Sequence, residues 1–330
     1  MNIYDISKEA GVSIATVSRV LNGSGKVSPK TRDRVLRVMR ENNYTPNAFA
    51  RGLGLGTMRT VGILCSDVSD LYISEAVYHI ERTLRAYEYD SLLCCTGFEL
   101  SAKKKYLKLL LSKNVDAVIF LGSQYVEEAP ADNEYIKEAA ETVPVFIMNG
   151  YIEGKNVYCA YCDEYTATFD LTEKLLNAGV REPVFLYRVN SESTRVKIRG
   201  IKDACAKAGV LFGEERAIVC PKGVYPCADA LEETAETLSF DCALCADDLI
   251  AVSVLKYAAA KGLRVPRDLR VCGYNDSILS FSTSPELTSV DNKMFALCRL
   301  TADNVINKLS GENISPKTVV SADIVERQST

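Results

Sequence analysis

The sequence predicts an α/β protein: an N-terminal three-helix, helix-turn-helix head and a body of two α/β subdomains with parallel sheets. Three observations predict this fold. The first 45 or so residues contain short helices with apolar stripes and no strand pattern. From Val61 onward, apolar strand-like segments alternate with amphipathic helices. Ten such strands are too many for one compact sheet of usual size, which favours two subdomains with a cleft between them.

The head is predicted from its helix start and stop signals. The first helix ends at Gly11, which makes the turn into the second helix. Ser13 caps the second helix, residues 14–21, because its hydroxyl can accept a bond from a free N–H of the first turn. Ser28 and Pro29 begin the third helix, with serine as the cap and proline in the first turn.

The body is predicted from alternating strands and helices. The expected strands are Val61–Cys65, Ser91–Cys95, Ala117–Leu121, Val143–Met148, Val157–Tyr161, Pro183–Tyr187, Ala217–Cys220, Cys242–Cys245, Arg270–Tyr274 and Leu287–Val290. The expected helices include Ser74–Tyr87, Lys103–Ser112, Ala167–Ala178, Ile198–Ala208, Ala228–Thr237 and Leu249–Lys261.

The charge of the chain is unevenly distributed. Residues 1–60 carry ten Lys/Arg and four Asp/Glu, whereas the remainder carries 29 Lys/Arg and 39 Asp/Glu. A basic head of net charge +6 on an acidic body of net charge −10 indicates a polyanionic partner at one end of the molecule. No apolar run is long enough to span a membrane, and the N-terminus lacks signal-peptide features, so we expect a cytoplasmic protein.

All twelve cysteines lie at or after Cys65, and two pairs have the spacing of a zinc site. These pairs are Cys159/Cys162 and Cys242/Cys245. Both fall in predicted strands, where residues three apart point to opposite faces and cannot share one metal ion. We therefore interpret the thiols as small buried apolar groups and expect no metal site and no disulfide.

The second helix has the composition of a helix that reads a DNA major groove. Its outward positions are Ile14, Ala15, Ser18, Arg19 and Asn22. Arg19 can form paired hydrogen bonds with guanine O6 and N7. Polar side chains that can lie near phosphates, and so fix register without reading sequence, are Tyr4, Ser13, Thr16, Asn22, Ser28, Lys30 and Thr31. A generic three-helix bundle is the alternative.

The head resembles the LacI/GalR family of bacterial transcription regulators. The resemblance is carried by Tyr4-Asp5-Ile6, Ala10–Ser13, Ala15–Asn22, Val27–Arg32, Asn43–Asn47, Ala50-Arg51 and Leu53. It implies that Ile14, Ala15 and Arg19 occupy base-reading positions. It also implies that residues 47–54 form a hinge helix that folds on operator DNA, with a leucine wedged into the minor groove. The hinge positions are Asn47, Ala50, Leu53 and Gly54, and this glycine makes the hinge easier to melt.

The body resembles the same family more loosely. The matching segments are Val61–Leu64, Ala246–Ala251, Gly262–Asp276, Pro285–Val290 and Arg327–Thr330. They imply the fold of periplasmic sugar-binding proteins, with crossings between subdomains near residues 160, 291 and 321. The expected domains are a DNA-binding head (1–46), a hinge and linker (47–60), an N-terminal subdomain (61–160 and 291–321) and a C-terminal subdomain (161–290 and 322–330).

The ligands of α/β sheets bind beyond the carboxyl ends of the strands. Candidates at such positions are Asp67, Leu71, Tyr72, Ser123, Gln124, Tyr187, Arg195, Lys197, Asp247 and Asn275. Their carboxylates, amides and aromatic rings suit a polyhydroxy ligand such as a sugar, although each could instead stabilise the subdomain interface. Lys197, three residues before Gly200, stands where the family commonly has arginine. Lysine offers a point charge and no planar fork for vicinal hydroxyls or a carboxylate, which argues against a typical sugar as the effector.

Other classes of function are less well supported. His79, the only histidine, lies within a predicted helix, which argues against histidine triads and histidine metal sites. Acid–base chemistry by Asp67 and Asp247 leaves an enzyme as one alternative, and a solute-binding protein is another. Tyr87–Asp90 and Lys103–Leu111 resemble the catabolite-control branch, whose members respond to a phosphorylated carrier protein. We expect a homodimeric repressor without cofactor, which binds operator DNA and is switched by a sugar-like molecule.

Overall fold

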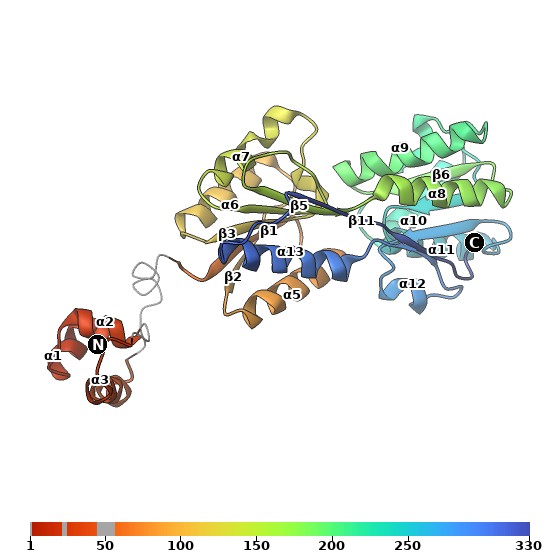
Figure 1. The fold of residues 1–330 in the computed structure, drawn as a ribbon. Coiled ribbons are helices and arrows are strands. Elements are labelled where there is room, and N and C mark those ends of the chain that lie inside the picture. The colour runs from red at the N-terminus through yellow and green to blue at the C-terminus, as the bar shows by residue number, and fades with distance from the viewer. Residues whose placement is uncertain (1, 22–24, 45–56) are drawn as a thin grey trace.

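The computed structural model describes residues 2–21, 25–44 and 57–330. Figure 1 shows a helical head and an elongated body with two groups of strands and helices. Each group is built on its own sheet, in which parallel pairing dominates. The predicted fold class is thus confirmed. Five residues with predicted roles lie outside the described ranges, namely Asn22, Asn47, Ala50, Leu53 and Gly54.

The described part of the head folds as the capping signals predict. Its helices are α1 (Ile3–Glu9), α2 (Ile14–Leu21) and α3 (Pro29–Glu41). The Ser13 hydroxyl accepts a bond from the backbone N–H of Thr16, and Ser28 caps α3 in the same way. Ile6, Val17 and Val35 are fully buried, so the apolar stripes of the helices meet in one small core.

The first sheet has the strand order β11-β5-β4-β3-β1-β2, and its strands are parallel. Apolar side chains of α5 and α13 cover one face, and those of α6 and α7 cover the other. The strands are β1 (Thr60–Cys65), β2 (Asp90–Cys95), β3 (Ala117–Leu121), β4 (Val145–Met148), β5 (Val157–Cys162) and β11 (Lys317–Val320). The helices are α5 (Leu71–Ala86), α6 (Leu100–Ser112), α7 (Glu134–Ala140) and α13 (Met294–Leu309).

The second sheet has the order β12-β10-β9-β8-β6-β7, with β12 antiparallel to β10. Helices α8 and α9 cover one face, and α10 and α11 cover the other. The strands are β6 (Pro183–Tyr187), β7 (Ala217–Val219), β8 (Cys242–Cys245), β9 (Arg270–Tyr274), β10 (Thr288–Asp291) and β12 (Asp323–Val325). The helices are α8 (Glu164–Asn177), α9 (Glu192–Lys207), α10 (Val224–Ala235), α11 (Asp248–Lys261) and α12 (Ile278–Ser282).

The chain passes between the two sheets after β5, after β10 and after β11. These passages form a narrow waist between the two halves of the body (Figure 1). Every strand predicted from the sequence is present, with ends that differ by at most two residues. Strands β11 and β12 and helices α7, α12 and α13 are not among the predicted elements.

The spaced cysteine pairs lie in strands and face opposite sides of the sheets, as predicted. Cys159 packs in the core beneath α6 and α7, whereas Cys162 packs with α5 and α13. Cys242 and Cys245 likewise belong to the cores on opposite faces of the second sheet. The paired thiols are therefore held apart by the sheet itself. Among the described residues, no helix is long and apolar enough to cross a membrane.

Candidate functional site

Helix α2 presents a mixed surface on the side away from the head core. Val17 and Val20 are buried against the other helices, whereas Ile14, Ala15 and Arg19 are exposed. An exposed arginine beside small apolar side chains can bond a base edge and contact a thymine methyl group. Ser18 is half-buried on the same helix.

The predicted phosphate contacts form two capping pairs and two exposed groups. The hydroxyls of Ser13 and Thr16 are 2.9 Å apart, and those of Ser28 and Thr31 are also 2.9 Å apart. Each pair fixes the N-terminus of a helix, where free N–H groups attract an anion. The other predicted residues, Tyr4 and Lys30, are exposed.

Helix α3 carries a basic surface that was not predicted from the sequence. Lys30, Arg34, Arg37 and Arg40 line one open hollow together with Thr31 and Asp33. Their spacing of three or four residues places them on one face of the helix. This face extends the positive charge of the head beyond the two capped N-termini.

Part of the predicted ligand set meets between the two sheets of the body. A cavity is lined by Leu71 and Tyr72 from the first subdomain and by Asp247 and Asn275 from the second. A second cavity, of about 240 Å³, was not predicted and lies beside the crossing from β5 to α8. Its lining includes Asn149, Tyr151, Glu164 and Glu192. Burial raises the pKa of Glu192.

Arg188, which was not predicted, bridges the two sides of the first cavity. Its Nη2 lies 2.6 Å from Asp247 Oδ2 in its own subdomain and 3.5 Å from Asp70 Oδ2 across the cleft. Asp247 also caps α11 by accepting a bond from the backbone N–H of Ile250. Burial raises the pKa of Asp247 even though the neighbouring guanidinium acts to lower it. The ion pair therefore offsets the cost of placing this carboxylate in the cleft.

Asp67, predicted to bind ligand, forms an ion pair across the same cleft. The Nζ atom of Lys222 lies 2.6 Å from Asp67 Oδ2 and also donates to Ser69. The bonds from Lys222 and Ser69 hold the pKa of Asp67 well below its usual range. In this arrangement Asp67 acts as an interface residue.

Lys197 is fixed by interior contacts. Its side chain is buried, and Nζ lies 3.4 Å from the centre of the Tyr274 ring and 3.6 Å from Glu164 Oε1. It also donates to the carbonyl of Ala246 at 3.3 Å. Lys197 lines neither of the two cavities described above.

The other predicted ligand residues lie around the cleft without lining either cavity. Gln124 donates to the Ser66 hydroxyl, and Arg195 donates across the cleft to the carbonyl of Val126. Ser123 is buried at the start of a 3-10 turn, and the Tyr187 ring stacks on a neighbouring phenylalanine.

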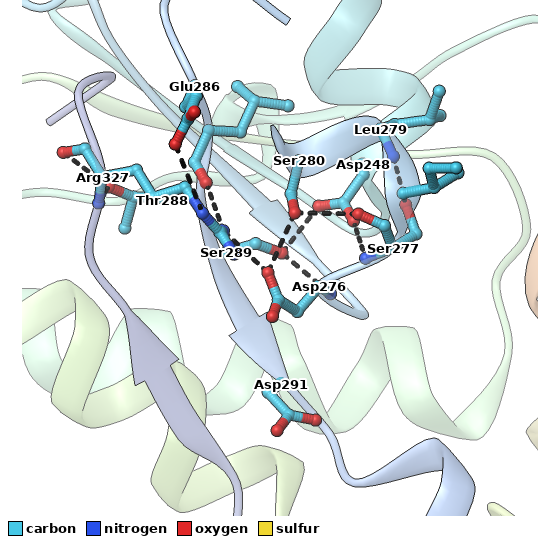
Figure 2. A network of polar contacts seen from close by, with 12 residues as sticks. Asp248, Asp276, Ser277, Leu279, Ser280, Glu286, Thr288, Ser289, Asp291 and Arg327 are labelled. Carbon is cyan, nitrogen blue, oxygen red and sulfur yellow. Dashed lines mark hydrogen bonds and ion pairs between the residues drawn. The ribbon is translucent and has the colours of Figure 1, made fainter. Parts of the chain in front are cut away.

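A polar network at the wall of the first cavity, which Asp248 and Ser277 help to line, holds the loop after β9. Figure 2 shows this network, in which the Ser289 hydroxyl and the Ser277 backbone N–H meet the carboxylate of Asp248. The hydroxyl of Ser289 donates to Asp248 Oδ1 at 2.6 Å, and the Ser277 N–H donates to Oδ2 at 2.7 Å. Burial raises the pKa of Asp248 to about 6. Arg327, near the C-terminus, forms an ion pair with Asp276 on the same loop.

His79 makes a packing contact on α5. Its ring is half-buried between Tyr78 and Phe295, with centroid distances of 5.0 and 4.6 Å. It lines neither cavity. Among the described residues, no group of three or more His, Cys, Asp or Glu side chains is arranged to hold a metal ion.

A helix-turn-helix head on a body of two α/β subdomains defines a class of bacterial regulators. Residues 2–47 match the family of bacterial regulatory proteins called the lacI family, and residues 172–330 match a periplasmic binding protein-like domain. This chain belongs to the lacI family. It is therefore a DNA-binding transcription regulator and not an enzyme.

Relatives align with the whole chain. It is 45% identical over 331 residues to an HTH-type transcriptional regulator of Lachnoclostridium phytofermentans, covering 100% of this chain and 99% of the relative. It is 30% identical to catabolite control protein A of Staphylococcus xylosus, with the same coverage. Its fold is similar to that of the lac repressor dimer bound to operator and the anti-inducer ONPF. That comparison has a TM-score of 0.83 at 22% identity and covers 100% of this chain and 98% of the other.

Proposed function

We propose that this protein is a repressor that binds a two-fold symmetric operator as a homodimer. The observation that carries the proposal is the exposed surface of α2, where Arg19 stands beside Ile14 and Ala15. One head presents one such helix, so two heads are needed to read two half-sites. The operator-bound dimer among the structural neighbours supports the same arrangement.

In this proposal, Ile14, Ala15, Ser18 and Arg19 read bases. Phosphates are held by Tyr4, Asn22 and Lys30 and by the two capped helix starts, which are Ser13 with Thr16 and Ser28 with Thr31. Residues 47–54 would place Leu53 in the minor groove, where inserting an apolar side chain unstacks a base step at a cost of a few kcal/mol, offset by new contacts.

The experiment that tests this assignment compares two head variants by fluorescence anisotropy on operator and random duplexes. Arg19→Ala is expected to cost about 1–3 kcal/mol on the operator and to relax selectivity at one base pair. Lys30→Ala is expected to weaken both duplexes alike and to reduce the salt dependence. Equal losses on the two duplexes for Arg19→Ala would contradict base reading by this residue.

The homodimer would form through exposed apolar side chains of the body. Tyr78 on α5 and Phe295 on α13 are more than half exposed, as are Ile278 and Phe281 on α12. In Figure 1, α5 and α12 lie along the same side of the body. Large exposed apolar groups of this kind mark interaction surfaces. Sedimentation equilibrium tests this assignment. The double variant Ile278→Asp/Phe281→Asp is expected to be a monomer. The control Leu211→Asp, at an exposed position elsewhere on the body, is expected to remain a dimer.

We assign the ligand-controlled change in operator affinity to the cleft between the two subdomains. The N-terminal subdomain is residues 61–160 with 291–321, and the C-terminal subdomain is residues 161–290 with 322–330. Leu71, Tyr72, Asp247 and Asn275 line its cavity, and their carboxylate, amide and ring groups suit a polyhydroxy ligand such as a sugar. A ligand can shift the operator equilibrium only by its differential affinity for the two states of the cleft. We propose that ligand binding releases the operator. Thermal-shift screening of sugars and phosphosugars tests the ligand class, because a ligand selective for the fold raises the melting temperature.

A second candidate is regulation by a phosphorylated carrier protein. The full-length identity of 30% to a catabolite control protein favours it. Of the segments that resemble this branch, Tyr87 and Lys108 are exposed, whereas Lys103 is buried in an ion pair with Glu127. An increase in operator affinity on adding the phosphorylated carrier, and none with the unphosphorylated form, would support this candidate over a free sugar.

A further inference from the structure

Two thiols of the first subdomain face each other at the carboxyl ends of adjacent strands. Cys65 is the last residue of β1 and Cys95 the last residue of β2, and they are register partners in the parallel pair. Their Sγ atoms lie 3.7 Å apart. The two backbones are thus already neighbours, and small side-chain rotations can bring the sulfurs into bonding distance.

The two thiols differ in their access to solvent. Cys95 is exposed, Cys94 is half-buried, and the other ten cysteines of the chain are buried. Cys65 is fully enclosed, and burial together with the neighbouring thiol raises its pKa to about 12. In a single protomer, a small oxidant arriving from solvent therefore meets Cys95 first, and Cys65 lies behind it as a protonated thiol.

We propose that Cys65 and Cys95 form a dithiol that hydrogen peroxide converts into an intramolecular disulfide. The Cys95 sulfur attacks the O–O bond of peroxide, which gives a sulfenic acid and one water molecule. The Cys65 sulfur then attacks the Cys95 sulfur. The S–S bond forms, the S–O bond breaks, and the hydroxyl group leaves with the Cys65 proton as a second water molecule. The two thiols lose two electrons, and the peroxide gains them.

Cys94 provides a matched control because it lies on the same strand but faces the other way. Cys65 belongs to the core under α5 and α13, whereas Cys94 packs against the core under α6 and α7. Successive residues of a strand point to opposite faces, so the sheet separates Cys94 from Cys65. Of the three neighbouring thiols, only Cys65 and Cys95 therefore lie on the same face of the sheet and can form the disulfide.

The position of the pair places oxidation next to the cleft. The backbone N–H of Thr96 donates to the carbonyl of Cys65, and that of Gly97 donates to the carbonyl of Ser66. Asp67, which follows Ser66 in the chain, makes the ion pair with Lys222 across the cleft. A cross-link at this point joins the two strand ends that lead into one side of the cleft.

The test is peroxide titration of the full-length protein, followed by intact-mass measurement and peptide mapping without reduction. We expect a mass lower by two hydrogen atoms, a linked Cys65–Cys95 peptide, and a fall from twelve to ten thiols counted in denaturant. Dithiothreitol should restore all twelve. Cys95→Ser is expected to abolish the link, and Cys94→Ser is expected to retain it.

Cys65→Ser gives an independent readout because it removes only the second step. Its Cys95 sulfenic acid should persist and be trapped by dimedone, whereas the unaltered chain should give little adduct. A Cys94–Cys95 link, a Cys95–Cys95 link between two chains, or twelve remaining thiols after peroxide would each overturn the proposal.

Discussion

Replacement of Arg188 by methionine removes the cation that joins the two sides of the first cavity. Arg188 and Asp247 have side chains that are 19% and 21% exposed, and their closest atoms are 2.6 Å apart. Removing one partner of a fully buried pair costs about 3–5 kcal/mol. Because solvent reaches about a fifth of each side chain, we expect the variant to lose about 2–3 kcal/mol of unfolding free energy at pH 7.

This loss should depend on pH with a definite sign. The pKa of Asp247 is already raised by burial, and losing Arg188 raises it further. A raised carboxyl pKa destabilises the folded state above that pKa and not below the unfolded value of about 3.9. The difference between the variant and the unaltered protein should therefore be largest at neutral pH and shrink toward pH 4.

Urea unfolding at several pH values measures this effect. Asp247→Asn should rescue Arg188→Met, because asparagine keeps an acceptor for the Ile250 N–H but carries no charge. Arg299→Met is the matched control, since its side chain is 83% exposed and its ion pair is worth little. A loss that is independent of pH and not rescued by Asp247→Asn would refute the reasoning.

Two further predictions concern helix packing and cleft closure. Gly200→Ala should lose about 1–3 kcal/mol of unfolding free energy, because its Cβ would lie 2.6 Å from the carbonyl oxygen of Tyr165. Ala206→Gly, at an exposed position one residue before the end of α9, is the control and should lose less than about 1 kcal/mol. A stabilised Gly200→Ala would contradict the close packing. A double-mutant cycle of unfolding free energies with Asp67→Asn and Lys222→Met should give a coupling energy of about 0.2–1 kcal/mol. This coupling should shrink in high salt, because salt screens exposed charges. A coupling of zero at low salt would show that the ion pair does not hold the cleft.

Much of the fold could be predicted because buried parallel strands are short apolar runs bounded by turn signals. The strands that were missed lie at sheet edges or near the chain end. In β11 (Lys317–Val320), exposed and half-buried residues alternate, and β12 (Asp323–Val325) is only three residues long. Helix α13 could have been found, because its buried residues recur at helical spacing through Met294, Leu297, Thr301 and Val305.

The cleft was harder to predict because its contacts join residues far apart in the sequence. Arg188 follows β6 directly, so the strand-end rule that selected Tyr187 could have selected it too. Its pairing with Asp247, 59 residues later, depends on the sheet order. The burial of Lys197 depends on the Tyr274 ring and Glu164, which reach it from a strand and another helix. Sequence position alone cannot separate a ligand contact from such an interior contact.

Selection of DNA by the purified full-length chain tests the central claim most directly. A pool of random duplexes should be enriched, at physiological salt, for a two-fold symmetric site with two similar half-sites. Arg19→Ala should lose selectivity at one base pair in each half-site while it still binds DNA. Recovery of unenriched random sequence, or of a single unpaired half-site, would contradict a dimeric, sequence-reading head.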